Sequence, residues 1–250
     1  MLLRITTVCN EGCSHCMVNA TPDGLAMSSE IFVDSLEFIV ALKPLNIQIT
    51  GGEPTLHPSF FTICKALRDR MKNSIIILES NGSFIADEIK YEQVKELLKK
   101  YNILLQVRTH PEYYPNYKKI WGNPKIKELT SYFYDDAISL SPFGRALENH
   151  LDRIVWNQKP CCSNMFLLSR QTNSLNQVVS VMESHGFFCK PLLSETGDIY
   201  VGEVSDCVKL GTVKDSLDDV YSKLRRNEPC DKCKLCHNIP EQAWKLLRGK

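Results

Sequence analysis

Three cysteines near the start of the chain are placed to bind metal. Cys9, Cys13 and Cys16 follow the apolar residues 2–8, which predict a β-strand. An iron–sulfur cube takes four cysteine thiolates, so a loop that supplies three leaves one iron open to a substrate or cofactor. Structural zinc is the alternative, but it prefers four closed ligands supplied as paired two-cysteine units. The spacing therefore favours an iron–sulfur cluster.

The chain contains 11 cysteines, and a second group of them lies at its other end. Because disulfides do not persist in a reducing compartment, two such groups of cysteines indicate metal binding. The run Cys230, Cys233, Cys236 has ferredoxin-like spacing, but Pro240 stands where a fourth cysteine would follow. The alternatives are a zinc knuckle and, from Cys233-Lys-Leu-Cys236-His237, a haem attachment site, although we expect no export signal at Met1 to Val8.

Alternating strand and helix patterns position the first cysteine loop. Ser28 is expected to cap a helix, with Met27 and Phe32 as a hydrophobic staple. The alternation extends to five or six units through two further apolar segments, 131–140 and 165–169, and a helical pattern at 174–185. The other predicted strands are 46–50, 74–78 and 103–108, and the other predicted helices are 29–42, 59–71 and 87–100.

This order predicts an α/β fold with parallel strands, a partial (β/α)6 TIM-like barrel over residues 1–186. A complete eight-unit barrel typically needs about 250 residues by itself. The tail differs, with a hairpin-like Lys190 to Val204 and helices near 215–226 and 240–248. We therefore expect a small cysteine-rich hairpin-and-helix domain over 187–250.

The spacing Cys9-x3-Cys13-x2-Cys16, together with Gly51-Gly52-Glu53-Pro54 after the second strand, resembles the radical S-adenosylmethionine (radical SAM) superfamily. The resemblance implies that the three cysteines hold a catalytic [4Fe-4S] cluster whose open iron binds S-adenosylmethionine. It also implies cofactor binding by Gly51, Gly52, Glu53 and Pro54. The two glycines let the backbone approach the methionine moiety of S-adenosylmethionine closely, and Glu53 accepts a hydrogen bond from its amino group.

Weaker parts of the resemblance concern five further cofactor-binding residues. Ser80 and Asn81 are similar to a polar strand ending that family members direct at the ribose or carboxylate of the cofactor. Arg108 closes the fourth strand, where the family often has a cofactor contact. Gly144-Arg145-Ala146 resembles a short motif after the fifth strand, which makes Arg145 a candidate. His15 stands where the family commonly has an aromatic residue near the adenine, a stacking role that imidazole can serve.

The tail resembles the auxiliary-cluster extension called the SPASM or twitch domain. The match runs through Cys189-x12-Gly202-x4-Cys207 and then Cys230 and Cys233. These four cysteines are the implied ligands of a second, auxiliary iron–sulfur cluster, with Cys236 competing for the last place. Cys161 and Cys162 could lend a ligand, while Cys64 lies on an apolar helix face and is expected in the core.

The resemblance implies hydrogen abstraction by a 5′-deoxyadenosyl radical, and we favour oxidation or cross-linking of a peptide or protein. The alternatives are a twitch-type dehydrogenase of a small alcohol or amino sugar, and a non-catalytic iron–sulfur or zinc redox sensor or adaptor. We expect an electron donor such as flavodoxin or ferredoxin. Because the chain starts at the first strand, we also expect precursor recognition by a separate protein or by a direct groove. Candidate substrate-facing residues are His110, Glu112, Tyr113, Tyr114, Tyr117, Asp135 and Asp136.

Composition narrows the class of protein. The 250 residues are 43% hydrophobic and 24% charged, which excludes disordered and collagen-like chains. The net charge of +1 predicts no long-range attraction to nucleic acid or acidic membrane. The longest apolar stretch, Phe38 to Leu42, is far short of a membrane helix. We therefore expect a cytoplasmic location.

Overall fold

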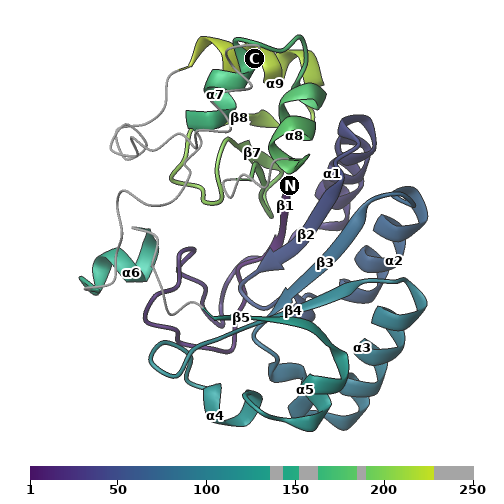
Figure 1. Ribbon diagram of the computed structural model, residues 1–250, viewed down its shortest axis with the longest axis vertical. Coiled ribbons are helices and arrows are strands. Elements are labelled where there is room, and N and C mark those ends of the chain that lie inside the picture. The colour runs from purple at the N-terminus through teal and green to yellow at the C-terminus, as the bar shows by residue number, and fades with distance from the viewer. Residues whose placement is uncertain (136–142, 152–162, 185–189, 228–250) are drawn as a thin grey trace.

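The computed structural model describes residues 1–135, 143–151, 163–184 and 190–227 (Figure 1). Its first part alternates strands with helices, as the sequence pattern predicts. The elements of this part are β1 (Leu2–Thr6), α1 (Ser29–Leu42), β2 (Asn46–Gly51), η1 (Pro54–Leu56), α2 (Phe60–Arg70), β3 (Ile75–Ser80), η2 (Ser83–Ala86), α3 (Glu88–Lys100), β4 (Leu104–Thr109), α4 (Tyr117–Ile120), α5 (Pro124–Leu129) and β5 (Thr130–Asp135).

The second part contains three longer helices, a short helix and three short strands. They are α6 (Gly144–Glu148), α7 (Ser163–Ser169), α8 (Leu175–Ser184), β6 (Leu192–Leu193), β7 (Asp198–Tyr200), β8 (Lys209–Thr212) and α9 (Leu217–Arg226). Figure 1 shows α7, α8 and α9 grouped at one end of the molecule, close to β7 and β8.

One sheet runs through both parts, in the order β5-β4-β3-β2-β1-β6-β7-β8. Strands β1 to β5 pair in parallel, and their apolar side chains lie in register: Leu3 is beside Ile49, Ile49 beside Leu78, and Leu78 beside Leu105. All four side chains are fully buried. The predicted α/β fold with a mostly parallel sheet is confirmed, and each strand of this group delivers its carboxyl end to the same edge.

Helices α1, α2 and α3 cover one face of the parallel strands (Figure 1). The predicted cap of α1 is confirmed, because Ser28 Oγ accepts from the Ile31 N–H at 3.2 Å. Met27 and Phe32 are both buried, as expected of a staple. At the other end of α1, Lys43 takes a left-handed conformation and its N–H bonds the carbonyl of Ile39. These local signals explain why this helix begins and ends where the sequence predicts.

The tail strands extend the sheet beyond β1. β6 pairs in parallel with β1, and β6, β7 and β8 then form antiparallel pairs. The predicted hairpin over Lys190 to Val204 is thereby confirmed, and Ser216 caps α9 by accepting from the Asp219 N–H. Arg4 of β1 ties the tail in place, since its Nε lies 2.6 Å from Glu195 Oε2 and its Nη2 lies 2.6 Å from Ser205 Oγ. The predicted boundary at 186/187 lies outside the described residues.

The strand expected at 165–169 is wrong, because these residues belong to helix α7. Met165, Phe166 and Leu168 are buried, and Tyr221 of α9 donates to the carbonyls of Ser169 and Thr172. A short apolar run does not by itself distinguish a buried strand from a buried helix. No helix in the described part of the chain is long and apolar enough to cross a membrane.

Candidate functional site

The predicted motifs meet at the carboxyl edge of the parallel strands. The cysteine loop follows β1, the Gly51 to Pro54 segment follows β2, and Ser80-Asn81 ends β3. The Glu53 N–H donates to the carbonyl of Val8 at 2.8 Å, which ties the second motif to the first. Asn81 Nδ2 lies 3.9 Å from Cys9 Sγ, which brings the third motif to the same loop.

The three thiols are set in a poorly solvated loop. Cys9 and Cys13 are buried and Cys16 is half-buried. Burial raises the pKa of the Cys9 thiol to about 11 and that of Cys13 to about 12, and the charge of the neighbouring thiols adds to both shifts. The thiols of Cys9 and Cys13 therefore keep their protons at neutral pH until a metal displaces them. Backbone N–H groups of Glu11 and Ala20 donate to Cys9 Sγ and Cys16 Sγ, both at 3.4 Å, and the bond from Glu11 opposes the rise in the pKa of Cys9.

This donor set fits an iron–sulfur cluster. Among the described residues, no three His, Cys, Asp or Glu side chains converge closely enough to hold a single metal ion. A closed zinc site needs such convergence. A cluster does not, because each cysteine binds a different iron. Three thiols on one loop are therefore suited to a cluster with one iron left open.

Gly51 and Gly52 allow β2 to approach β1 closely. A Cβ at Gly51 would lie 2.3 Å from the carbonyl oxygen of Thr6, and a Cβ at Gly52 would lie 2.3 Å from that of Val8. The Gly52 N–H also donates to Thr6 at 2.8 Å. Any side chain at either position would push the second motif away from the cysteine loop.

Glu53 is fully buried and joins the ends of β2 and β3. Its Oε1 accepts from Thr55 Oγ1 at 2.7 Å, and its Oε2 accepts from the Asn81 N–H at 2.8 Å. Ser80 Oγ donates to the same carboxylate at 2.9 Å. Burial raises the pKa of Glu53, and these donors oppose the shift. The carboxylate thus holds Ser80 and Asn81 beside the cysteine loop.

Arg145 of α6 binds the backbone of the cysteine loop. Its Nε donates to the carbonyl of Cys13 at 2.8 Å and its Nη1 to that of Ala20 at 2.9 Å. The Arg145 N–H donates to the carbonyl of Cys16 at 2.9 Å. Gly144, with φ +54°, permits this approach, since a Cβ there would lie 2.4 Å from the Cys16 oxygen. In the structure, the guanidinium expected at the cofactor orders the loop that carries the thiols.

An aromatic wall flanks the cysteine loop. The ring of His15, which is 9% exposed, lies 5.1 Å from that of Tyr113 and 4.8 Å from that of Tyr114. His110 stacks on Tyr113 at 4.9 Å. Both tyrosines form a buried cluster with Cys13. Of the loop residues expected to face a substrate, His110, Tyr113 and Tyr114 are therefore buried beside the thiols, whereas Glu112 is exposed.

Arg108 pairs with a neighbouring strand. Its Nε donates to Glu79 Oε1 at 2.7 Å, and its Nη2 contacts the same oxygen. Gln106 Nε2 donates to that oxygen at 3.2 Å. The residue predicted as a cofactor contact thus belongs to a polar group that bridges β3 and β4.

The tail cysteines are described only in part. Cys207 is half-buried, and it packs against the hydrophobic core. Cys64 is fully buried in the core, as expected. The remaining predicted tail and middle positions lie outside the described residues, as does Asp136; they are Cys161, Cys162, Cys189, Cys230, Cys233 and Cys236. For Asp135 only the backbone of β5 is described.

Sequence reasoning missed three residues that organise this edge. Asn10 Oδ1 accepts from Asn81 Nδ2 at 3.1 Å, Thr55 anchors Glu53, and Asn116 Nδ2 donates to the carbonyl of Asn81 at 3.0 Å. Asn10 and Thr55 lie next to recognised motifs, so their polarity was a usable signal. Asn116 is 35 positions from its partner, and no local pattern marks it.

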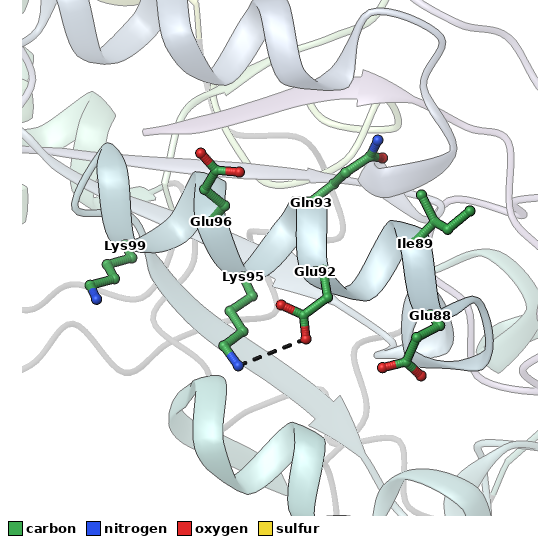
Figure 2. Close-up of a pocket in the computed structure, with 7 residues that line it drawn as sticks. All are labelled: Glu88, Ile89, Glu92, Gln93, Lys95, Glu96 and Lys99. Atoms are coloured by element: carbon green, nitrogen blue, oxygen red, sulfur yellow. Dashed lines mark ion pairs between the residues drawn. The ribbon is translucent and has the colours of Figure 1, made fainter.

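A hollow on the surface of α3 is separate from this site. Figure 2 shows that its lining comes from the one helix, with Lys95 Nζ 3.8 Å from Glu92 Oε1. The lining contains none of the predicted site residues; it consists of Glu88, Ile89, Glu92, Gln93, Lys95, Glu96 and Lys99. The chemistry-bearing side chains instead gather at the carboxyl edge.

Two proteins with known activities match part of the sequence. GTP 3′,8-cyclase of Klebsiella pneumoniae is 30% identical over 93 residues, which cover 35% of this chain and 28% of that protein. The enzyme of the same name from Edwardsiella ictaluri is 29% identical over 92 residues, covering 35% of this chain and 28% of that protein. The matches therefore span less than a third of these relatives.

Solved structures share the fold over nearly the whole chain. BtrN in complex with AdoMet and 2-DOIA has a TM-score of 0.56 at 15% identity, covering 99% of this chain and 86% of that one. Streptococcus suis SuiB bound to its precursor peptide SuiA has a TM-score of 0.54 at 15% identity, covering 94% and 68%. The profile of the Radical SAM superfamily matches residues 3–154, the region that carries the cysteine loop and the other motifs of the carboxyl edge. The chain is therefore a member of the radical SAM superfamily.

Proposed function

We propose that this chain cleaves S-adenosylmethionine reductively and uses the resulting radical to modify a peptide or protein oxidatively. The observation that carries the proposal is the grouping at the carboxyl edge: three thiols on one loop, held against Glu53 and Asn81. A non-catalytic sensor needs thiols but has no need of the Gly51 to Pro54 segment beside them. Membership of the superfamily supports a catalyst over such a sensor.

Different residues of this chain bind the cluster, contact the cofactor and exclude water. When bound, the cluster and S-adenosylmethionine supply one-electron reduction and a 5′-deoxyadenosyl radical that abstracts hydrogen. Cys9, Cys13 and Cys16 hold the cluster, while Asn81 and Ser80, fixed by Glu53, present polar atoms to the cofactor. His15 and the tyrosines beside it exclude water from one side of the loop. The backbone of Gly52 and Pro54 completes the cofactor cradle.

Two solved structures favour different substrates. SuiB binds the precursor peptide SuiA, and BtrN binds 2-DOIA. Within the described residues, β5 has a neighbour on one side only, so the parallel sheet is open at that edge. An open edge admits an extended chain laterally, which favours a peptide. The second candidate function, dehydrogenation of a small alcohol or amino sugar, is favoured by the coverage of BtrN, 86% of its length.

We further propose an auxiliary iron–sulfur cluster held by Cys189, Cys207, Cys230 and Cys233, with Cys236 as the competing last ligand. Cys207 supports this assignment, because it is half-buried and packs against the hydrophobic core rather than being enclosed within it. Such a cluster would accept the electron left on the substrate after hydrogen abstraction. It would also explain a cysteine content of 11 in this chain.

The test is anaerobic reconstitution of wild type and Cys13→Ala, followed by reduction with dithionite and quantification of 5′-deoxyadenosine. Wild type should form it, whereas the variant should form none, because two thiols cannot hold the cluster with one iron open. Cys64→Ala is the matched control, since it removes a core cysteine and should retain cleavage. Persistent cleavage by Cys13→Ala would reject the proposed function.

A further inference from the structure

We propose that α4, α5 and the turn between them form the docking surface for an acidic electron-carrier protein that reduces the cluster. The surface consists of Lys118, Lys119, Trp121 and Lys127. It rests on the proposed function, because a radical SAM enzyme must receive one electron for each cleavage.

The charge of this segment is of one sign. Residues 117–127 contain four lysines and no acidic residue, in a chain whose net charge is only +1. Lys118, Lys119 and Lys127 are exposed. Lys125 is different, because it pairs with Glu88. Three exposed ammonium groups on one segment attract an acidic partner and accelerate its approach.

The same segment is connected to the cysteine loop by packing. Tyr117 packs against the buried cluster formed by Cys13 and the two tyrosines. Asn116, immediately before it, bonds the carbonyl of Asn81. A partner seated on α4 would therefore be close to the thiols.

Trp121 gives this surface an aromatic contact. Its ring stacks on Tyr117 with centroids 5.8 Å apart and 15° between the planes, and its side chain is 53% exposed. Exposed tryptophan is unusual on a surface but frequent at the centre of protein interfaces. The stack thus runs from the protein surface through Tyr117 to the packing around Cys13. This arrangement separates the segment from an ordinary solvated lysine patch.

The electron balance of the step is simple. A reduced flavin or iron–sulfur centre of the partner loses one electron, and the cluster held by Cys9, Cys13 and Cys16 gains it. No bond to the protein forms or breaks. The lysines take no part beyond orienting the partner, so a small diffusible reductant does not need them.

The experiment compares K118E/K119E with K99E/K100E in the reconstituted enzyme. Both pairs are adjacent exposed lysines in the last turn of a helix, so the two variants change charge and helix ends alike. Flavodoxin hydroquinone is the protein reductant, dithionite the small one, and cluster reduction is followed by stopped-flow absorbance. Association with oxidised flavodoxin is measured by calorimetry at low and high salt, which requires no turnover.

We expect K118E/K119E to be reduced by flavodoxin at least ~10-fold more slowly than wild type at low salt, with weaker association, and the difference to shrink at high salt. Dithionite should reduce both variants at the wild-type rate. Trp121→Ala should slow reduction by flavodoxin with little change in salt dependence.

Equal rates of reduction by flavodoxin in both lysine variants would overturn the docking proposal while leaving the proposed function intact. Failure of dithionite to support cleavage in wild type would instead reject the proposed function. Salt-dependent binding of a single-stranded RNA oligonucleotide that is lost in K118E/K119E, with reduction by flavodoxin unchanged, would assign the surface to nucleic acid.

Discussion

Glu53 joins three chain segments through a single carboxylate. Both of its oxygens only accept hydrogen bonds, from Thr55, Ser80 and the backbone of Asn81. The side-chain amide of a glutamine in its place would direct its own N–H donor at one of the groups that donate to the carboxylate. We therefore expect Glu53→Gln to lower the free energy of unfolding by about 2 kcal/mol, as for other buried groups that lose a charged hydrogen bond.

Urea denaturation of the apo protein measures this change in Glu53→Gln. Thr55→Val is the control, because it removes one donor to the carboxylate and should lose about 1 kcal/mol. A Gln variant as stable as wild type would show that the carboxylate does not hold the ends of β2 and β3 together.

His57 gives the fold a sensitivity to acid. The Ser59 N–H donates to its Nδ1 at 3.0 Å, so its Nε2 must carry the proton that bonds the carbonyl of Met27 at 2.9 Å. Burial lowers the pKa of His57, and the bond to Met27 opposes the shift. The neutral ring therefore stabilises the fold above the unfolded pKa of about 6.5, and this contribution is lost as pH falls through the lower folded value.

We expect the free energy of unfolding to fall between pH 7.5 and 5 less steeply in His57→Asn than in wild type. The difference arises because the unfolded chain protonates His57 at a higher pH than the folded protein does. His150→Asn, at an exposed position, should keep the wild-type slope. Parallel pH profiles for wild type and His57→Asn would exclude this role of the buried ring.

At the scale of elements, α6 and the cysteine loop act as one unit. Gly144 lies where a Cβ would meet the backbone oxygens of Cys16 and Met17 at 2.4 and 2.7 Å. Gly144→Ala should therefore displace α6, withdraw Arg145 from the carbonyl of Cys13 and loosen the loop that carries the thiols. We expect less iron per chain after reconstitution and destabilisation of about 2 kcal/mol or more.

Gly122→Ala is the matched control for Gly144→Ala. Gly122 also has positive φ, +79°, but a Cβ there would meet no atom within 4 Å. Its alanine variant should show only the backbone strain of about 1 kcal/mol and bind iron normally. Equal iron content in the two variants, measured by elemental analysis, would mean that α6 does not support the cluster.

For the whole molecule, two metal centres in separate parts of the chain should be removable one at a time. Cys207 belongs to the tail that packs beside β1, whereas Cys9, Cys13 and Cys16 follow β1 at its carboxyl end. We expect about eight irons per chain in wild type and about four when these three cysteines are all alanine. Cys207→Ala and Cys233→Ala should each lower iron content but retain cleavage of S-adenosylmethionine.

Iron and sulfide analysis distinguishes the arrangements of the tail. About four irons in wild type and none in the triple variant, with zinc retained in both, would establish a structural zinc tail. Iron unchanged in both Cys207→Ala and Cys233→Ala would reject the auxiliary cluster. The buried pair of Arg4 and Glu195, which joins β1 to the tail, should keep the tail folded in either case.

The sequence alone determined the local elements, because their causes lie within a few residues. The cap at Ser28 and the apolar spacing of α1 to α3 depend on neighbours in the chain, so these elements were predictable to within a residue or two. The cysteine spacing and the Gly51 to Pro54 segment were equally local. Together they predicted the superfamily and the edge of the sheet at which the motifs lie.

The tertiary structure alone decided contacts between distant segments. Residues 165–169 form a helix that packs against α9, and Arg4 of β1 meets Glu195, beyond β6, across 191 positions. Arg145 braces Cys13 across 132 positions, and Tyr117 joins the packing around the same loop. Such pairings depend on which surfaces meet after the chain has folded, so no periodicity or spacing within a short window encodes them.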